Sequence, residues 1–191
     1  MGRQGSFIKL FTDIVISLVI LIVSLPILLI CMVAIKLETP GPAIFIQDRA
    51  GYKGKKFKMY KLRGMFENAH ELGPELTVKD DPRVTKVGRL LRRLSIDEIP
   101  QFFNVLKGDM SIIGPRPEII SITDNYTEEQ RKVFDYKPGI TGYSQINGRQ
   151  LLTPDERIKM ELEYYAKANF FTDLIIFLKT PIIVFTNEGN L

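Results

Sequence analysis

Residues 14–35 read IVISLVILIVSLPILLICMVAI, a run of 22 residues without a charge between Asp13 and Lys36. About 20 consecutive apolar residues are enough for a helix to cross the hydrocarbon core of a bilayer. The run is too long for the apolar core of a cleaved signal peptide, and no cleavage site follows it before the next charged segment. The sequence therefore predicts a membrane-embedded helix near the beginning of the chain.

Pro26 lies in the middle of this run and leaves two topologies open. Proline removes a backbone donor and kinks a helix, and the hydroxyl of Ser24 can bond to a carbonyl that the kink frees. A sharp break would let the helix enter and leave the membrane by the same face, whereas a straight helix would span it. Basic residues flank both ends, so the positive-inside rule gives no direction.

The composition fits a folded domain with anionic partners. Of the 191 residues, 25% are charged and 45% are hydrophobic, which is typical of globular order. The net charge of +4 fits phosphates, nucleic acid or acidic lipid headgroups without choosing among them. A single cysteine excludes an intrachain disulfide framework and a cysteine-based metal cluster.

Beyond the apolar run the sequence predicts an α+β fold that is mostly helical. Short β-prone segments at 43–47 and 57–62 predict a small hairpin or sheet. Residues 170–185 are strongly apolar but contain Asp173 and Lys179, which favours a helix in the membrane interface or in the core. Helices are also expected over 85–94, 95–106, 127–136 and 155–168, with a proline-locked loop at 112–117 and a glycine-rich turn region at 137–149.

Asp97-Glu98 is an acidic pair with two interpretations. Residues 95–98 (SIDE) match a capping box, in which acids of the first turn only stabilise a helix start. Alternatively, the helix dipole keeps a carboxylate ionised there, and the free backbone donors hold a phosphate. Such a carboxylate can attack phosphorus and form an acyl-phosphate, while its neighbour helps to hold Mg²⁺. Taken alone, the pair favours the cap.

Basic side chains follow the pair closely in sequence. Arg89, Arg92 and Arg93 recur at helical spacing on one side, which fits either a solvated surface or a phosphate site. Arg116 is fixed between two prolines, which fits either a structural turn with a surface arginine or a binding site, since a planar guanidinium suits bidentate contacts to phosphate or a base. The turn at 147–149 (NGR) supplies exposed backbone and a further cation, a candidate phosphate cradle.

Five segments occur in a fixed order along the chain. They read MYKLRGM at 59–65, RRLSIDEIPQ at 92–101, NVLKGDMS at 104–111, IGPRP at 113–117, and KPGITG at 137–142 with QINGR at 145–149. Together they resemble the monotopic phosphoglycosyl transferases, the bacterial sugar transferase family. The resemblance runs from about residue 7 to residue 185, and its specificity comes from the five motifs together rather than from any one.

The resemblance implies a fold, an activity and a location. Residues 1–38 would form a re-entrant membrane helix, broken at a Ser/Pro element, and residues 39–191 a compact catalytic domain with amphipathic interfacial helices. The enzyme would be a glycosyl-1-phosphate transferase of the bacterial inner membrane, with its catalytic domain on the cytoplasmic face. It would take a phospho-sugar from a UDP-sugar, release UMP, and pass the phospho-sugar to a polyprenyl phosphate such as undecaprenyl phosphate. That reaction initiates a surface glycan.

The resemblance also assigns residues. Asp97 would be the nucleophile that carries the phosphosugar-aspartyl intermediate, and Asp97 and Glu98 would hold Mg²⁺. The expected partners are the two substrates and membrane lipid, with no nucleic acid; the oligomeric state is left open. The candidate substrate-binding residues are Lys61, Arg63, Arg89, Arg92, Arg116, Gln145, Asn147 and Arg149.

Two departures from the family pattern stand out. The break reads Ser24-Leu25-Pro26 where an adjacent Ser-Pro is common, and Gly64 replaces a usual Thr or Ser.

Two other functions could use the same residues. A phosphatase or pyrophosphatase would use aspartyl-phosphate chemistry with water as acceptor, and a non-catalytic membrane adaptor would use only the basic face.

Overall fold

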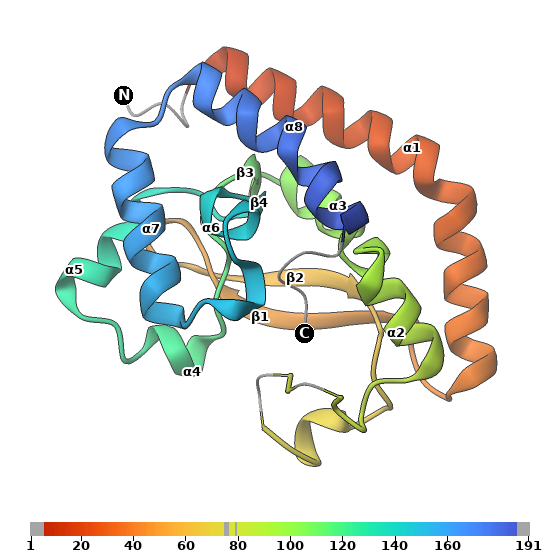
Figure 1. The fold of residues 1–191 in the computed structure, drawn as a ribbon. Helices are drawn as coiled ribbons and strands as arrows, with labels where there is room; N and C mark the ends of the chain where they lie inside the picture. Colours follow the sequence, from red (N-terminus) through yellow and green to blue (C-terminus); the bar gives the residue numbers. More distant parts are fainter. Residues whose placement is uncertain (1–5, 75–76, 79, 187–191) are drawn as a thin grey trace.

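The computed structural model describes residues 6–74, 77–78 and 80–186, so the outer ends of both predicted domain ranges lie outside the described residues (Figure 1). Helix α1 (Phe7–Glu38) contains Pro26, and Figure 1 shows it bending once along its length. An internal proline is a common cause of such a bend. The Ser24 hydroxyl donates to the carbonyl of Leu21 at 3.4 Å, one residue before the carbonyl that Pro26 leaves unpaired.

One narrow stripe of α1 is buried, and the rest of its surface is exposed and apolar. The most apolar stretch of the helix has a mean hydropathy of 3.2, and only 22% of it is buried. By length and composition the helix can therefore cross a membrane. The buried stripe repeats at intervals of four and seven residues, which keeps it on one face, and consists of Asp13, Ser17, Leu21, Leu28 and Ile35.

Two small sheets form the β part of the fold. Strands β1 (Ile44–Ala50) and β2 (Lys56–Leu62) pair antiparallel, from Ile44 opposite Leu62 to Ala50 opposite Lys56, which confirms the predicted hairpin. Strands β3 (Ser111–Ile113) and β4 (Gly139–Thr141) pair in parallel, where a loop and a turn region were predicted. A Cβ on Gly139 would lie 2.0 Å from the nitrogen of Gly114, so glycine allows these backbones to touch.

Helix α2 (Lys86–Arg93) begins at Thr85, whose hydroxyl accepts from the backbone of Gly88 at 2.9 Å. The prediction of a single helix over 95–106 is wrong. Ser95 has φ = 53°, a 3₁₀ turn spans Ile96–Glu98, and helix α3 spans only Gln101–Leu106. The left-handed residue interrupts the helical path between α2 and the acidic pair. No Ser95 side-chain cap forms, so the capping-box interpretation is also wrong.

The C-terminal half is helical, as predicted. Thr127 and Thr153 both make complete capping boxes at the starts of α5 (Glu128–Arg131) and α7 (Pro154–Lys167). A 3₁₀ turn, Lys132–Asp135, continues α5, and α8 (Phe170–Thr186) runs through Pro181. The short helices α4 (Ile120–Thr123) and α6 (Tyr143–Ile146) and the 3₁₀ turns Tyr52–Gly54, Ala69–Glu71 and Arg149–Leu151 complete the described elements.

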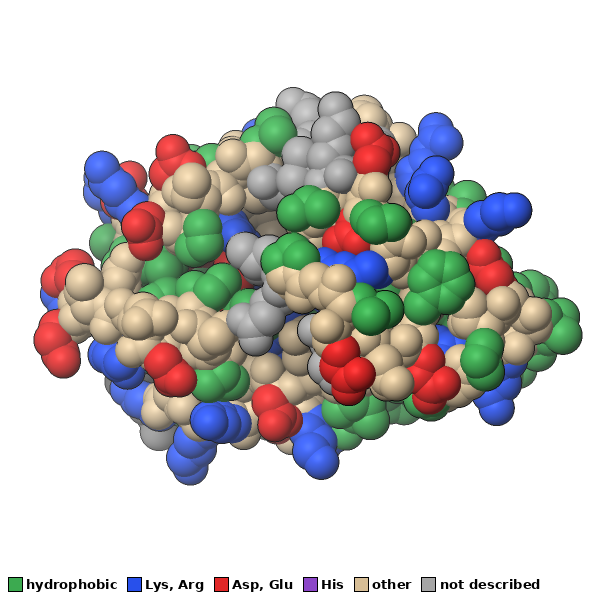
Figure 2. All heavy atoms as spheres, turned by 90° about the horizontal axis from the view of Figure 1, so that it is seen from below, with side chains coloured by type: hydrophobic (Ala, Val, Ile, Leu, Met, Phe, Trp, Pro, Cys, Tyr) green, Lys and Arg blue, Asp and Glu red, His purple; other side chains and the backbone are tan. Residues whose placement is uncertain are grey.

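Two apolar clusters tie α1 to the rest of the chain. Ile16 of α1 packs against the cluster that contains Val105 of α3, Tyr164 of α7 and Ile176 of α8. Leu28 and Ile35 of α1 share a second cluster with residues of β2 and α2. Figure 1 shows α8 beside the first part of α1, whereas the opposite face in Figure 2 carries charged side chains of both signs. Helix α1 is therefore one structural body with the α+β core.

Candidate active site

The acidic pair lies in the turn between α2 and α3, directly beside α1. Its flanking residues Ile96 and Ile99 pack against the cluster that contains Leu28 and Ile35 of α1. Asp97 is 8% exposed. The left-handed Ser95 and the 3₁₀ turn therefore place the two carboxylates beside the second half of α1. Because the turn is only three residues long, no long helix dipole acts on them.

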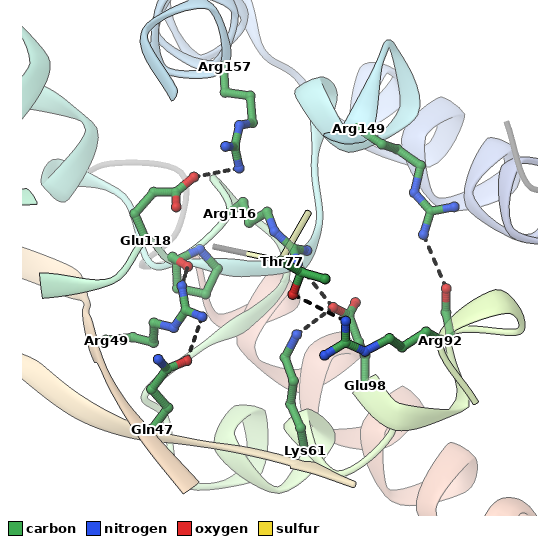
Figure 3. A network of polar contacts seen from close by, with 12 residues as sticks. Gln47, Arg49, Lys61, Thr77, Arg92, Glu98, Arg116, Glu118, Arg149 and Arg157 are labelled. Atoms are coloured by element: carbon green, nitrogen blue, oxygen red, sulfur yellow. Dashed lines mark hydrogen bonds and ion pairs between the residues drawn. The ribbon is translucent and has the colours of Figure 1, made fainter. Parts of the chain in front are cut away.

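The two carboxylates have different environments. Glu98 Oε1 accepts from the ammonium of Lys61 at 2.8 Å and from Nη2 of Arg116 at 3.2 Å, as Figure 3 shows. In the described part of the chain, the carboxylate of Asp97 makes neither a hydrogen bond nor an ion pair. Glu98 is thus held in place by two cations, whereas Asp97 is not.

Burial acts on both acids, but the neighbouring cations act more strongly on Glu98. Burial raises the pKa of Asp97, the charge of Glu98 adds to the effect, and Lys61, Arg92 and Arg116 oppose it. For Glu98, burial is outweighed by the charges and hydrogen bonds of Lys61 and Arg116, which together hold its pKa well below the usual range. The sequence-based expectation that a long helix dipole acts on Asp97 is wrong, because the pair lies in a three-residue 3₁₀ turn. The groups that oppose the rise in the pKa of Asp97 are the neighbouring cations.

Two more arginines, Arg92 and Arg149, lie near the acidic pair in addition to Lys61 and Arg116. Arg92 of α2 donates to the hydroxyl of Thr77 at 3.2 Å, and its charge interacts with both acids. Arg149, in the left-handed region at φ = 49°, donates to the hydroxyl of Ser95 at 3.2 Å. Its other terminal nitrogen, Nη1, is buried and has no partner in the described structure. Lys61, Arg92, Arg116 and Arg149 thus place four positive charges around two negative ones, an arrangement suited to a phosphate dianion.

A second layer of contacts supports Arg116. The side chain of Arg49 donates to the carbonyl of Pro117 at 3.1 Å and to the side chain of Gln47 at 2.6 Å. Glu118 pairs with Arg157 of α7 at 2.6 Å (Figure 3). Neither Arg49 nor Arg157 is among the residues predicted from the sequence. Arg49 lies just beyond the β-prone segment predicted at 43–47, and Arg157 resembles any surface arginine of an amphipathic helix.

Four of the predicted substrate-binding residues have no described contact with the pair. Arg63 is buried and donates to the carbonyls of Thr39 and Pro40, where it fixes the chain as it leaves α1. Arg89 points into solvent on α2. Gln145 is buried on α6 and accepts from the Ser144 hydroxyl at 3.3 Å, and Asn147 donates to the carbonyl of Tyr143 at 2.8 Å.

The acidic pair fits a magnesium ion, although the described residues form no cluster of three or more acidic, histidine or cysteine side chains. Mg²⁺ is commonly held by one or two carboxylates together with substrate phosphates and water. Both described contacts of Glu98 use Oε1, so in the described structure Oε2 of Glu98 and the carboxylate of Asp97 have no hydrogen-bond or ion-pair partner. These oxygens would hold the ion.

The model of the bacterial sugar transferase family matches residues 4–187. The chain belongs to the bacterial sugar transferase family. Among similar proteins, a UDP-N-acetylgalactosamine-undecaprenyl-phosphate N-acetylgalactosaminephosphotransferase of Aeromonas hydrophila is 41% identical over 192 residues, covering 96% of this chain and 45% of the relative. A UDP-glucose:undecaprenyl-phosphate glucose-1-phosphate transferase of Escherichia coli (strain K12) is 40% identical over 190 residues, covering 95% and 41%.

A third relative has a length close to that of this bacterial sugar transferase. The protein named "Uncharacterized sugar transferase EpsL" of Bacillus subtilis (strain 168) is 39% identical over 182 residues, covering 95% of this chain and 89% of the relative. In contrast, this chain spans less than half the length of the Aeromonas and Escherichia relatives. The family membership predicted from the five motifs is confirmed.

Proposed function

We propose that this bacterial sugar transferase is a phosphoglycosyl transferase that moves a sugar 1-phosphate from a UDP-sugar to a polyprenyl phosphate, with undecaprenyl phosphate as the expected carrier. The observation that carries the proposal is a buried Asp97 that has no hydrogen-bond or ion-pair partner among the described residues, beside a Glu98 held by Lys61 and Arg116. The names of the relatives describe this class of reaction on several sugars. They differ in the sugar, so the sugar is left open.

The chemistry proceeds in two displacements at one site. A carboxylate oxygen of Asp97 attacks the β-phosphorus of the UDP-sugar, the bond to the bridging oxygen breaks, and UMP leaves with that oxygen. The sugar phosphate is then an acyl-phosphate on Asp97. A phosphate oxygen of the polyprenyl phosphate attacks the same phosphorus, the bond to Asp97 breaks, and the carboxylate is restored.

The basic residues supply the electrostatics of both displacements. Arg92 and Arg149 approach the pair from two elements and would hold the diphosphate oxygens, while Lys61 and Arg116 fix Glu98. Asp97 and Glu98 would hold Mg²⁺, which supplies positive charge to a transferred phosphoryl group. Donors placed before the reaction stabilise charge as it develops, which is the main source of catalysis in phosphoryl transfer.

The position of the pair beside α1 supports a lipid acceptor and a monotopic arrangement. Ser111 of the core donates to Asp13 near the start of α1 at 2.7 Å. At the other end, Glu38 accepts from the backbone of Lys86 at 2.7 Å. The two ends of α1 thus contact the same globular body, which favours entry and exit by one face of the inner membrane. We place that face in the cytoplasm, where the nucleotide sugar is available.

Incubation of the purified protein with single UDP-sugars, Mg²⁺ and undecaprenyl phosphate tests the activity. We expect UMP and a lipid-linked sugar in equal amounts from at least one donor. Asp97→Asn should abolish both products, whereas Asp135→Asn, which alters an exposed pair with Lys53, should retain them. UMP together with free sugar phosphate, and no lipid product, would instead support a hydrolase. No UMP from any donor would contradict both enzymatic functions.

A labelling experiment tests the topology. In a Cys31→Ser background, single cysteines at Ser6 and Lys55 are treated with a membrane-impermeant maleimide, in intact cells and after permeabilisation. We expect both to react only after permeabilisation, because both lie on the cytoplasmic side. Labelling of the Ser6 position in intact cells, with Lys55 still protected, would show a spanning helix.

A further inference from the structure

The outer edge of strand β2 is completed by a side chain rather than by a third strand. Among the described strands β2 pairs only with β1, so the backbone groups of Lys58 and Tyr60 face away from that partner. The side chain of Asn104 meets them. Its Nδ2 donates to the carbonyl of Lys58 at 2.7 Å, and its Oδ1 accepts from the amide of Tyr60 at 3.1 Å. One amide thus serves the strand edge as the backbone of a neighbouring strand would.

Asn104 is also fixed on its own side. Its exposed fraction is 0%, and its second amide hydrogen points toward Asp109 at 3.4 Å. Its backbone carbonyl accepts from the amides of Asp109 at 3.0 Å and Met110 at 3.3 Å, which closes the turn after α3. A buried side chain with all its polar atoms engaged holds its two neighbouring elements at a fixed separation.

Strand β2 carries one member of the central ion pair, and the 3₁₀ turn just before α3 carries the other. Strand β2 continues from Tyr60 directly to Lys61, and α3 begins three residues after Glu98. Lys61 and Glu98 meet at 2.8 Å, with side chains only 17% and 18% exposed. A buried contact of this kind is sensitive to a small shift of either element, because a misplacement of about 1 Å at a catalytic group can cost about 100-fold in rate.

We infer that Asn104 is a positioning residue, which joins the edge of β2 to α3 and thereby sets the Lys61–Glu98 contact in the active site. The inference rests on the proposed function only where it concerns catalysis. Its structural part, that Asn104 holds Lys61 against Glu98, stands on the contacts of Asn104 and can be tested without an active enzyme.

The variant Asn104→Asp is nearly isosteric and keeps the acceptor for Tyr60, but it loses the donors to Lys58 and Asp109. The matched control is Asn125→Asp, because the Nδ2 of Asn125 also donates to a backbone carbonyl, that of Ser121, at 2.8 Å on the exposed side of α4. Melting temperatures of both variants establish that they are folded at the assay temperature.

The first measurement is the rate at which an amine-reactive reagent labels Lys61, followed by peptide mass spectrometry. In wild type the ammonium of Lys61 is buried against Glu98, so we expect slow labelling. Asn104→Asp should accelerate the labelling of Lys61 at least about fivefold through local opening, without accelerating exposed Lys53. Asn125→Asp should change neither. Equal Lys61 labelling in wild type and Asn104→Asp would overturn the inference, whether or not the protein transfers sugar phosphate.

The second measurement is a double-mutant cycle with Lys61→Met. We expect Asn104→Asp alone to lower kcat about tenfold or more while KM for the UDP-sugar changes less than about twofold. In the Lys61→Met background the same change should cost less than about twofold, because Asn104 acts through Lys61. Multiplicative losses would overturn the inference and show a structural role alone. A wild type without activity would refute the proposed function, and the labelling result would still decide the role of Asn104.

Discussion

Replacement of Lys61 by methionine removes one partner of the buried ion pair and leaves the apolar part of the side chain in place. Lys61 and Glu98 lie 2.8 Å apart, and Glu98 keeps Arg116 at 3.2 Å. At an effective dielectric constant of about 20, a pair at this distance attracts with about 6 kcal/mol before the cost of desolvation. Breaking a buried pair typically costs about 3–5 kcal/mol, because the remaining charge is left without compensation.

Because Arg116 still compensates Glu98, we place the loss in unfolding free energy at about 2–3 kcal/mol. In a protein of this size each kcal/mol lowers the melting temperature by about 2–4 °C, so a decrease of about 4–12 °C is expected at pH 7. The effect should also depend on pH. The pKa of Glu98 is depressed in the folded state, so this stabilisation is present above the unfolded carboxyl pKa and is lost as the pH falls. The difference between wild type and variant should therefore narrow below about pH 4.

The assay is thermal unfolding of the detergent-solubilised protein, with Lys53→Met as the matched control. Lys53 and Asp135 lie closer, at 2.6 Å, but their side chains are 55% and 58% exposed. Solvent screens such a pair, so the control should lower the melting temperature by less than about 2 °C. Equal decreases in the two variants, or a higher melting temperature for Lys61→Met, would refute the assignment of Lys61–Glu98 as a buried, stabilising pair.

Three further predictions follow from the geometry. Glu161 is 2% exposed, and burial raises its pKa to about 7. The protein therefore loses stability as the pH rises toward that value, because the carboxyl group is harder to ionise in the folded state than in the unfolded state. We expect Glu161→Gln to have a higher melting temperature than wild type at pH 8 but not at pH 5. On one helix, Arg92→Ala should lower kcat/KM by about 10- to 100-fold, in line with the loss of one charge-assisted phosphate contact, whereas Arg89→Ala should stay within about twofold in the same UMP assay. In Gly88→Ala the new methyl group would lie 2.0 Å from the carbonyl oxygen of Gly64, so the melting temperature should decrease by about 5 °C or more; an unchanged value would show that the two backbones can separate.

Local patterns predicted much of the fold. The run of 22 uncharged residues predicted the long apolar helix, and alternating residues predicted the hairpin. The helices after Thr127 and Thr153 were predicted from their caps. Each of these signals depends on a few neighbouring residues. The parallel pairing of β3 with β4 could not be predicted, because it joins two three-residue strands whose partners lie far apart in sequence. The interruption of the helix at Ser95 could not be predicted from the sequence either. A serine shortly before an acid favours a helix cap locally, whereas Ser95 is left-handed and Glu98 contacts Lys61 and Arg116, two residues that lie far from it in sequence.

In the candidate active site, too, sequence patterns did not predict contacts between residues that lie far apart in sequence. The five linked motifs were enough to predict the family and to single out Asp97, but each motif gave every basic residue equal weight. Arg63 and Arg116 both lie in such motifs, yet one donates to the carbonyl of Thr39 and the other to Glu98. Gly64 illustrates how one departure from the family pattern fits its surroundings, since a Cβ there would lie 3.2 Å from Nε of Arg92 and 3.5 Å from Cα of Gly88.

The most direct test of the central claim is a search for sugar phosphate attached to Asp97. The protein is mixed with its UDP-sugar and Mg²⁺ without a lipid acceptor, quenched, and examined by intact and peptide mass spectrometry. We expect close to one UMP released per enzyme, a mass increase equal to one sugar phosphate on the peptide that contains Asp97, and loss of this mass when polyprenyl phosphate is added. Asp97→Asn should show neither the UMP burst nor the adduct. A stoichiometric burst that persists in Asp97→Asn, or UMP release that requires the lipid and leaves no adduct, would contradict a covalent intermediate on Asp97.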